Sequence, residues 1–174
     1  YLHGSTLGIF GEGALGQATA SIARALGMRV LFADHPPPKA SGVEFTDPEI
    51  VLAESDIISL HCPLTPASRH FIGMEQLKKM KRSAILINTA RGGLVDEHSL
   101  KTALEAGLIA GAGFDVLTQE PPKEGNPLLE LRMPNFILTP HVAWASDGAM
   151  QFLANQLMDN IEACIAGTPQ NLVT

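Results

Sequence analysis

The sequence predicts an α/β fold in which a doubly wound parallel sheet lies between two layers of helices (three-layer α/β/α). Short runs of apolar and β-branched residues recur at regular intervals, and most gaps between them hold a helical pattern. The runs are apolar almost throughout rather than alternating, which is typical of strands buried on both faces. Strand and helix therefore alternate as in a parallel sheet with crossover helices.

Six strands are expected along the chain. They are Thr6–Phe10, Arg29–Ala33, Asp56–Leu60, Ala84–Asn88, Ala110–Val116 and Asn135–Thr139. Every gap except the fifth holds a plausible helix. The segment between Asp34 and Asp47, which contains Pro36-Pro37-Pro38, and the segment Gln119–Pro127 are expected to be loops. Neither is a domain linker, because the regular spacing of strands continues across both.

Capping residues mark the helix boundaries. The first helix, Ala14–Leu26, ends before Gly27, and its apolar positions are Leu15, Ala18, Ile22 and Leu26. Asp47-Pro48 begins a second helix, because an acceptor side chain precedes a proline in the first turn. A further helix, Asp96–Ala106, ends before Gly107.

A long helix is expected near the end of the chain, capped by Ser146 and running to Ala166 before Gly167. We expect it to be a packing helix. One stripe of this helix is apolar: Met150, Leu153, Leu157, Ile161, Cys164 and Ile165.

Length and composition favour one globular domain. The strand pattern assigns residues 1–145 to it, and a helix and tail follow in residues 146–174. Of 174 residues, 45% are hydrophobic and 17% charged. The net charge of -6 argues against nucleic-acid or anionic-membrane partners. The two cysteines lack CxxC spacing, which favours a reducing, cytoplasmic environment without disulfides. Because the chain begins at Tyr1, close to a strand, we expect that a preceding segment has been removed.

The segment Gly11–Gly16 (GEGALG) matches the GxGxxG pattern of dinucleotide-binding Rossmann domains. The pattern follows a strand, opens a helix at Ala14-Leu15, and is completed by Asp34 after the second strand. Gly11 permits the tight turn, Gly13 lets the backbone approach the pyrophosphate, and Gly16 lets the helix pack closely. Backbone N–H groups at the helix start would then hold the phosphates.

Asp34 favours NAD over NADP. It should accept hydrogen bonds from the adenosine ribose hydroxyls. A carboxylate about 4 Å from a 2′-phosphate costs about 4 kcal/mol at an effective dielectric constant of 20. No arginine follows to offset this cost: the next residues are His35 and prolines, and Lys39 is the nearest cation.

Four polar residues lie at or after the ends of later strands, where open α/β sheets bind ligands. Arg91 can grip a carboxylate or a ketone oxygen with two parallel bonds, and His141 can donate a proton near neutral pH. Glu120 would favour the imidazolium form of a nearby histidine, and Asp115 could accept a bond from the nicotinamide amide. Each could equally be structural. The other histidines, His3, His35, His70 and His98 among them, are expected to have ordinary structural roles.

No metal site is expected, because the adjacent His61-Cys62 lacks partners at ligand spacing. The chain also has no GxSxG motif, and its glycine cluster lacks the Lys-Ser/Thr of a P-loop.

The chain resembles the D-isomer-specific 2-hydroxyacid dehydrogenase family over nearly its whole length. The resemblance is carried, in the family's order, by Leu7–Gly16, His61–Thr65, Ile87–Asp96 (INTARGGLVD), Gly113–Pro121 and Thr139–His141. It implies that Arg91 binds substrate, that Glu120 pairs with His141, and that His141 is the proton donor. The implied NAD contacts are Ala14, Leu15, Asp34, Cys62, Pro63, Thr89, Ala90, Arg91, Asp115, His141 and Ala143. Asn135–Ser146 and the segment from Glu120 to Leu129 look most like glycerate dehydrogenases, which reduce hydroxypyruvate.

Members of this family also have a substrate domain that this chain lacks, and the final helix with Asn171–Thr174 resembles the return to that domain. We therefore expect the chain alone to bind NAD but to be inactive. The family resemblance further implies a homodimer, with contacts from the first or last helix. Alternatives are the same chemistry on phosphoglycerate, lactate-type acids, formate or phosphite, or an NAD-responsive corepressor without catalysis.

Overall fold

A computed structural model describes residues 2–35 and 42–172 of the chain. The strands are β1 (Thr6–Phe10), β2 (Arg29–Ala33), β3 (Phe45–Thr46), β4 (Ile57–Leu60), β5 (Ile85–Asn88), β6 (Gly111–Phe114) and β7 (Phe136–Leu138). The helices are α1 (Ala14–Ala25), α2 (Pro48–Glu54), α3 (Met74–Lys79), α4 (Glu97–Glu105) and α5 (Asp147–Ile165), with 3₁₀ turns η1 (Gly92–Leu94) and η2 (Pro127–Glu130). The chain divides into two compact units, residues 1–140 and 141–174, which are described separately below.

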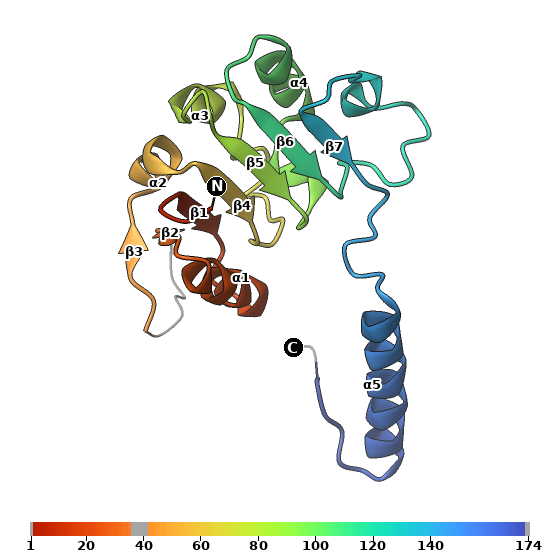
Figure 1. Cartoon of the computed structure of the whole chain (residues 1–174). Coiled ribbons are helices and arrows are strands. Elements are labelled where there is room, and N and C mark those ends of the chain that lie inside the picture. Colours follow the sequence, from red (N-terminus) through yellow and green to blue (C-terminus); the bar gives the residue numbers. More distant parts are fainter. Residues whose placement is uncertain (1, 36–41, 173–174) are drawn as a thin grey trace. The chain divides into compact units, whose positions relative to one another are not determined.

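The first unit is a parallel sheet of seven strands in the order β3-β2-β1-β4-β5-β6-β7 (Figure 1). The chain winds outward from β1 through β2 to β3, then returns to β4 on the other side of β1 and winds the other way. The carboxyl ends of β1 and β4 therefore form the switch point, where open α/β sheets bind ligands. The predicted doubly wound, Rossmann-like fold is confirmed.

Two apolar clusters hold the helices on the sheet. α1 covers one face, where Ile9 and Phe32 pack against Ala20 and Ala23. α2, α3 and α4 cover the other face over a larger cluster. Ile58, among its members, is fully buried. Because apolar strand residues contribute to a cluster on each face of the sheet, the strands are continuous apolar runs in the sequence.

The predicted capping residues have the expected geometry. Asp47 accepts a bond from the Glu49 N–H at 2.7 Å at the start of α2. Asp96 accepts one from the Ser99 N–H at 2.7 Å at the start of α4. The glycines that follow α1, α4 and α5 all have positive φ, as left-handed C-terminal positions require: Gly27 (76°), Gly107 (63°) and Gly167 (74°).

The apolar positions predicted for α1 are not the positions that face the sheet. Its members lie outside the core, and Leu15 is 74% exposed. The residues that face the sheet are instead the small ones: Gly16, Ala20 and Ala23. α1 lies too close to the sheet for large side chains, which are therefore displaced to its flanks.

The expected loop between Asp34 and Asp47 contains a short strand, β3, that pairs with β2 through Phe32↔Phe45 and Ala33↔Thr46. A strand of two residues has no periodicity to detect, and only the edge of β2 makes it a strand. Pro36–Pro38 and Lys39, which entered the sequence argument, lie outside the described residues.

The second unit consists of α5 and its flanking segments, and the helix expected after Ser146 is present, although within the described part of this unit it packs against no other element. Ser146 caps α5 by accepting the Ala149 N–H at 3.2 Å, but no residue of the helix is buried. Its apolar stripe is exposed, with Leu157 at 61%. Within residues 141–172 there is no second element against which the stripe could pack. None of the described helices is long and apolar enough to span a membrane.

Asp56 joins the amino ends of β1 and β4, and its replacement by asparagine should lower stability. Its carboxylate accepts the Thr6 N–H at 2.8 Å and binds Lys81 Nζ at 2.7 Å, and these bonds lower the pKa of Asp56. A lowered pKa stabilises the fold above the unfolded-state value of about 4, and this contribution disappears as pH falls through the folded-state pKa. Asp56→Asn should therefore cost about 1 kcal/mol at pH 7, the group being partly exposed, and less at pH 3.

Urea unfolding at both pH values measures this difference. Glu75→Gln is the control, because its exposed pair with Lys78 on α3 should matter little. A cost for Asp56→Asn that is equal at both pH values would contradict the charge-based explanation.

Candidate cofactor and substrate site

The turn between β1 and α1 is closely packed against the end of β4. Gly11 has φ of 105°, and a Cβ there would lie 2.6 Å from the Cys62 backbone nitrogen. A Cβ on Gly16 would lie 2.0 Å from the Gly11 carbonyl oxygen. These two positions therefore require glycine for steric reasons, and together they allow α1 to begin directly at the switch point.

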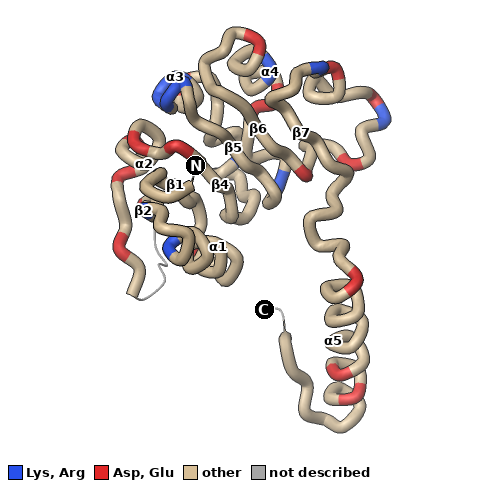
Figure 2. Tube along the Cα trace, in the orientation of Figure 1, with Lys and Arg blue, Asp and Glu red and all other residues tan. Residues whose placement is uncertain are grey.

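Gly13 differs from both, because a Cβ there would meet nothing within 4 Å. Gly13 is the N-cap of α1, no side chain caps this helix start, and Ala14 and Leu15 are exposed. The first N–H groups of α1, at the positive end of the helix dipole, therefore face outward. α1 has a single basic residue, Arg24, in its last turn (Figure 2), so an anion at its start would be held by backbone groups. This arrangement fits the pyrophosphate of a dinucleotide.

Asp34 directly follows β2 and is exposed. Its backbone N–H donates to the Thr46 carbonyl at 2.8 Å, and its Oδ1 accepts the His35 N–H at 2.8 Å. The side chain of His35 in turn meets Glu12 of the glycine turn, with Nε2 and Oε2 2.7 Å apart. The structure therefore brings the glycine turn and the Asp34 segment together, as the dinucleotide motif requires.

The Thr89–Arg91 turn follows β5 and is held by Asn88. The Asn88 side chain is fully buried; its Nδ2 donates to the Arg91 carbonyl at 2.9 Å and its Oδ1 accepts the Ala90 N–H at 3.1 Å. The Arg91 side chain is exposed, with Nη1 donating to the Ala90 carbonyl at 2.6 Å. Sequence analysis did not identify Asn88 as a positioning residue. The available signal was an amide side chain that closes an apolar strand.

The loop that carries Glu120 packs against the Arg91 turn. A Cβ on Gly92 would lie 2.0 Å from the Leu117 carbonyl carbon. Glu120 Oε1 accepts the Leu117 N–H at 2.7 Å, and Glu97 Oε1 accepts the Thr118 N–H at 2.8 Å. The segments bearing Arg91 and Glu120 are therefore fixed next to each other at the same sheet edge.

Asp115 follows β6 and is 2% exposed. It accepts a short hydrogen bond from the Thr139 hydroxyl, and its own N–H donates to the Asn88 carbonyl at 3.0 Å. It thereby joins the carboxyl ends of β5, β6 and β7. Its bond to a nicotinamide amide stays a prediction.

Cys62 and Pro63 follow β4 beside the glycine turn. Burial raises the pKa of the Cys62 thiol to about 11, so the thiol stays protonated near neutral pH. Such a thiol can line a site but is a poor nucleophile. Burial lowers the pKa of His61, whose Nε2 lies 2.9 Å from Ser59 Oγ. Within residues 2–35 and 42–172, no three His, Cys, Asp or Glu side chains are grouped to hold a metal ion.

His141 and Ala143 begin the second unit, and both are exposed. His141 has φ of 56°, a conformation that is uncommon for residues other than glycine and is found at functional sites. His70 and Asn171 share it, so φ alone does not identify a site. Trp144 Nε1 donates to the His141 carbonyl at 3.0 Å and fixes this turn. The pairing of Glu120 with His141 stays a prediction, because the two residues belong to different units.

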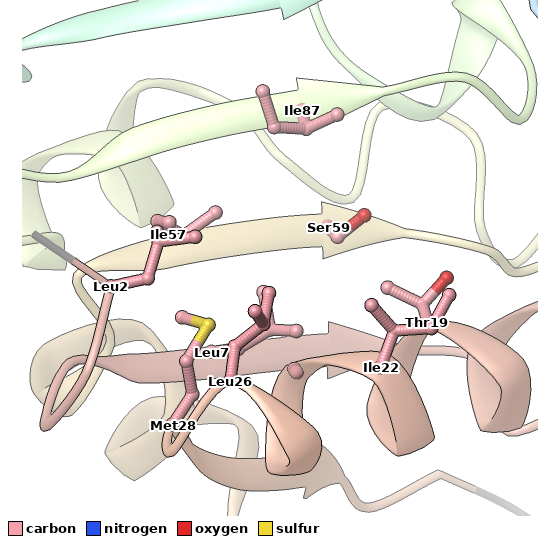
Figure 3. Close-up of a pocket in the computed structure, with 10 residues that line it drawn as sticks. Leu2, Leu7, Thr19, Ile22, Leu26, Met28, Ile57, Ser59 and Ile87 are labelled. Atoms are coloured by element: carbon pink, nitrogen blue, oxygen red, sulfur yellow. The ribbon is translucent and has the colours of Figure 1, made fainter.

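A groove of about 290 Å³ lies beside α1 on its face of the sheet (Figure 3). Its walls are mostly apolar, with Ile22 and Leu26 from α1, Ile57 and Ile87 from the sheet, and Leu2 from the start of the chain. None of the predicted site residues lines it, so it is separate from the candidate site.

Comparison with known proteins identifies a matching domain. Residues 1–143 match the model described as "D-isomer specific 2-hydroxyacid dehydrogenase, NAD binding domain". The chain is 62% identical over 170 residues to a glycerate dehydrogenase of Methylorubrum extorquens, covering 98% of this chain and 53% of that protein. It is 46% identical over 177 residues to a glyoxylate reductase of Korarchaeum cryptofilum, covering 99% and 53%.

A solved structure gives the same result. The crystal structure of an NAD-complexed D-isomer specific 2-hydroxyacid dehydrogenase from Lactobacillus delbrueckii ssp. bulgaricus matches with a TM-score of 0.88 and 35% identity. The match covers 99% of this chain and 57% of that one. The chain thus spans about half the length of the relatives it matches.

The glycine turn yields a prediction with an internal control. Gly16→Ala should cost more than about 3 kcal/mol, because its Cβ would overlap the Gly11 backbone. Gly13→Ala should change stability by less than about 1 kcal/mol, the size of an N-cap effect. It should nevertheless weaken NADH binding by about tenfold or more, because its Cβ points into the space assigned to the pyrophosphate.

Denaturant unfolding and NADH fluorescence titration distinguish the two variants. Unchanged NADH affinity in Gly13→Ala would be evidence against the pyrophosphate position assigned here.

Proposed function

Because the chain belongs to the D-isomer specific 2-hydroxyacid dehydrogenase family and carries its NAD binding domain, we propose that the full protein transfers a hydride between NAD(H) and the C2 carbon of a small D-2-hydroxy acid. The observation that carries the proposal is the arrangement at the carboxyl edge of the sheet. The uncapped start of α1, the Asp34 carboxylate and the Arg91 guanidinium all follow strands at this edge. They suit a pyrophosphate, a ribose and a substrate carboxylate respectively.

We propose the following role for each residue. Gly13, Ala14 and Leu15 hold the cofactor phosphates through backbone N–H groups, and Asp34 accepts bonds from the adenosine ribose hydroxyls. Thr89, Ala90, Cys62, Pro63, Asp115 and Ala143 line the rest of the cofactor site. The cofactor, when bound, would supply the hydride as NADH or accept it as NAD.

The chemistry then requires one substrate anchor and one proton donor. Arg91 holds the substrate carboxylate or ketone oxygen with two parallel bonds, and Asn88 fixes the turn from which Arg91 extends. His141 donates a proton to the oxygen on C2 as the hydride reaches the carbon, and it removes that proton in the reverse direction. Glu120 stabilises the imidazolium form of His141.

The substrate we propose is glycerate, with hydroxypyruvate as its oxidised form. The support is the 62% identity to a glycerate dehydrogenase, together with the resemblance of residues 120–129 and 135–146 to that class. Glyoxylate, phosphoglycerate, lactate-type acids, formate and phosphite are the competing substrates. The residues that choose among them belong largely to a substrate domain outside this chain.

We also propose that residues 146–174 lead back to this substrate domain and that the full protein is a homodimer. The exposed apolar stripe of α5 supports a contact outside the second unit. Sedimentation of the full protein would decide its oligomeric state.

A substrate panel tests the proposed reaction. The full protein should oxidise NADH faster with hydroxypyruvate than with glyoxylate, pyruvate or 3-phosphohydroxypyruvate. Formate is assayed separately by the reduction of NAD, which should be slower. The 174-residue chain alone should bind NADH but should not oxidise it with any of these acids, since the proposed active site needs a second domain. Turnover by the chain alone would refute the need for a second domain, and a full protein inactive on the whole panel would refute the proposed reaction.

His141→Gln in the full protein tests the proton donor. We expect kcat to fall by about 10²- to 10⁴-fold, because glutamine cannot donate the proton, while NADH affinity changes little. Stopped-flow turnover and NADH titration give the two quantities. His98→Gln is the control, since His98 is exposed on α4. Equal kcat values for the two variants would exclude His141 as the donor.

A further inference from the structure

Glu12 occupies an unexpected position in the glycine turn. Its Oε2 lies 2.7 Å from His35 Nε2, and the two side chains are only 12% and 33% exposed respectively. The His35 ring also packs edge-on against Phe45, with ring centroids 5.5 Å apart and planes at 87°. Gln17 Nε2 fixes the backbone beneath by donating to the Glu12 carbonyl at 2.7 Å. The pair is therefore part of the packed turn and not a mobile surface contact.

The same histidine is contacted by a second carboxylate. Asp34 Oδ1 accepts the His35 backbone N–H at 2.8 Å, while Glu12 binds the His35 ring. Two carboxylates from separate segments, the β1–α1 turn and the end of β2, thus converge on one residue. Because the acidic residue after the second strand faces the adenosine ribose in dinucleotide-binding folds, this convergence lies at the 2′ position of that ribose.

A 2′-phosphate would meet unfavourable charge here for two reasons. A second carboxylate adds to the repulsion from Asp34, and such repulsion falls only as the inverse of distance. In addition, folds that accept a 2′-phosphate use a nearby cationic side chain to hold it. The ring of His35, the residue that directly follows Asp34, is bound at Nε2 by Glu12.

We propose that Glu12 is a specificity-determining residue: bound to His35, it places a second carboxylate beside Asp34, so that the site accepts the 2′-hydroxyl of NAD and rejects the 2′-phosphate of NADP. The proposal rests on the cofactor site assigned under Proposed function. This role differs from that of Asp34. Glu12 needs no hydrogen bond to the ribose, and it acts through its charge and through its hydrogen bond with His35.

The alternative is that the pair only fastens the turn to β2. Glu12→Gln separates the two possibilities, because glutamine keeps an oxygen that can accept a bond from His35 but removes the charge. If the pair only fastens the turn, Glu12→Gln should weaken NADH and NADPH equally or leave both unchanged. If the charge selects the cofactor, NADPH binding alone should improve.

The experiment titrates the chain with NADH and NADPH by fluorescence at low and high salt. For Glu12→Gln we expect the ratio of the NADPH Kd to the NADH Kd to fall about tenfold at low salt, mainly through tighter NADPH binding. The fall should be smaller at 1 M salt, where the Debye length is about 3 Å. Glu54→Gln is the matched control. It breaks the pair of Glu54 with the Arg29 guanidinium, 2.7 Å apart, which lies at the opposite end of β2, and the ratio should stay unchanged.

A second variant, Glu12→Gln with His35→Asn, measures the contribution of the ring. Its gain in NADPH binding should be smaller than that of Glu12→Gln alone, because asparagine lacks the imidazole ring that can donate a hydrogen bond to the phosphate.

Three results would overturn the proposal: an unchanged ratio in Glu12→Gln, equal weakening of both cofactors, or the same change in Glu54→Gln. Failure of the unaltered chain to bind NADH would overturn it together with the cofactor site. Failure of the full protein to reduce any 2-keto acid would count against the proposed reaction only, because the selectivity is read from binding.

Discussion

The contact between the glycine turn and the sheet is the constraint on which the rest of the site depends. Gly16 lies against the Gly11 carbonyl, and Gly11 lies against the backbone that follows β4, so neither position has room for a Cβ. The resulting close approach places the start of α1 at the switch point of the sheet. There the first N–H groups of α1 and the positive end of its dipole can bind an anion. No basic side chain is needed, and the turn Gly11–Gly16 contains none.

Buried polar side chains hold the loops along the carboxyl edge of the sheet in place. Asn88 and Asp115 are almost completely buried, and each forms hydrogen bonds that join neighbouring strand ends or hold a turn. Burying such groups is unfavourable unless they are paired, so once paired they define a single arrangement of the loops. The exposed Arg91 therefore extends from a rigid turn although its own side chain is solvent-accessible.

The helices α1 and α5 both expose large apolar side chains. Large apolar residues of α1 border the groove beside it, and the α5 stripe is uncovered within residues 141–172. Exposure on this scale is typical of surfaces that contact another domain or subunit. It is consistent with a chain that spans about half the length of its relatives.

The sequence by itself determined six of the seven strands, the helix caps and the dinucleotide motif, because these depend on local features: apolar runs, acceptor residues before helices, and glycines where φ is positive. Family resemblance supplied roles for Arg91, Glu120 and His141 that no local pattern could. The tertiary structure decided what depends on distance between segments. It showed which face of α1 is buried, because helix-to-sheet separation selects small residues regardless of the apolar pattern. It also showed that Glu12 meets His35, since these residues lie 23 positions apart and come together only when β1 and β2 pair in one sheet. The hold of Asn88 on the Arg91 turn is a local contact, but the sequence does not show which backbone groups the amide binds.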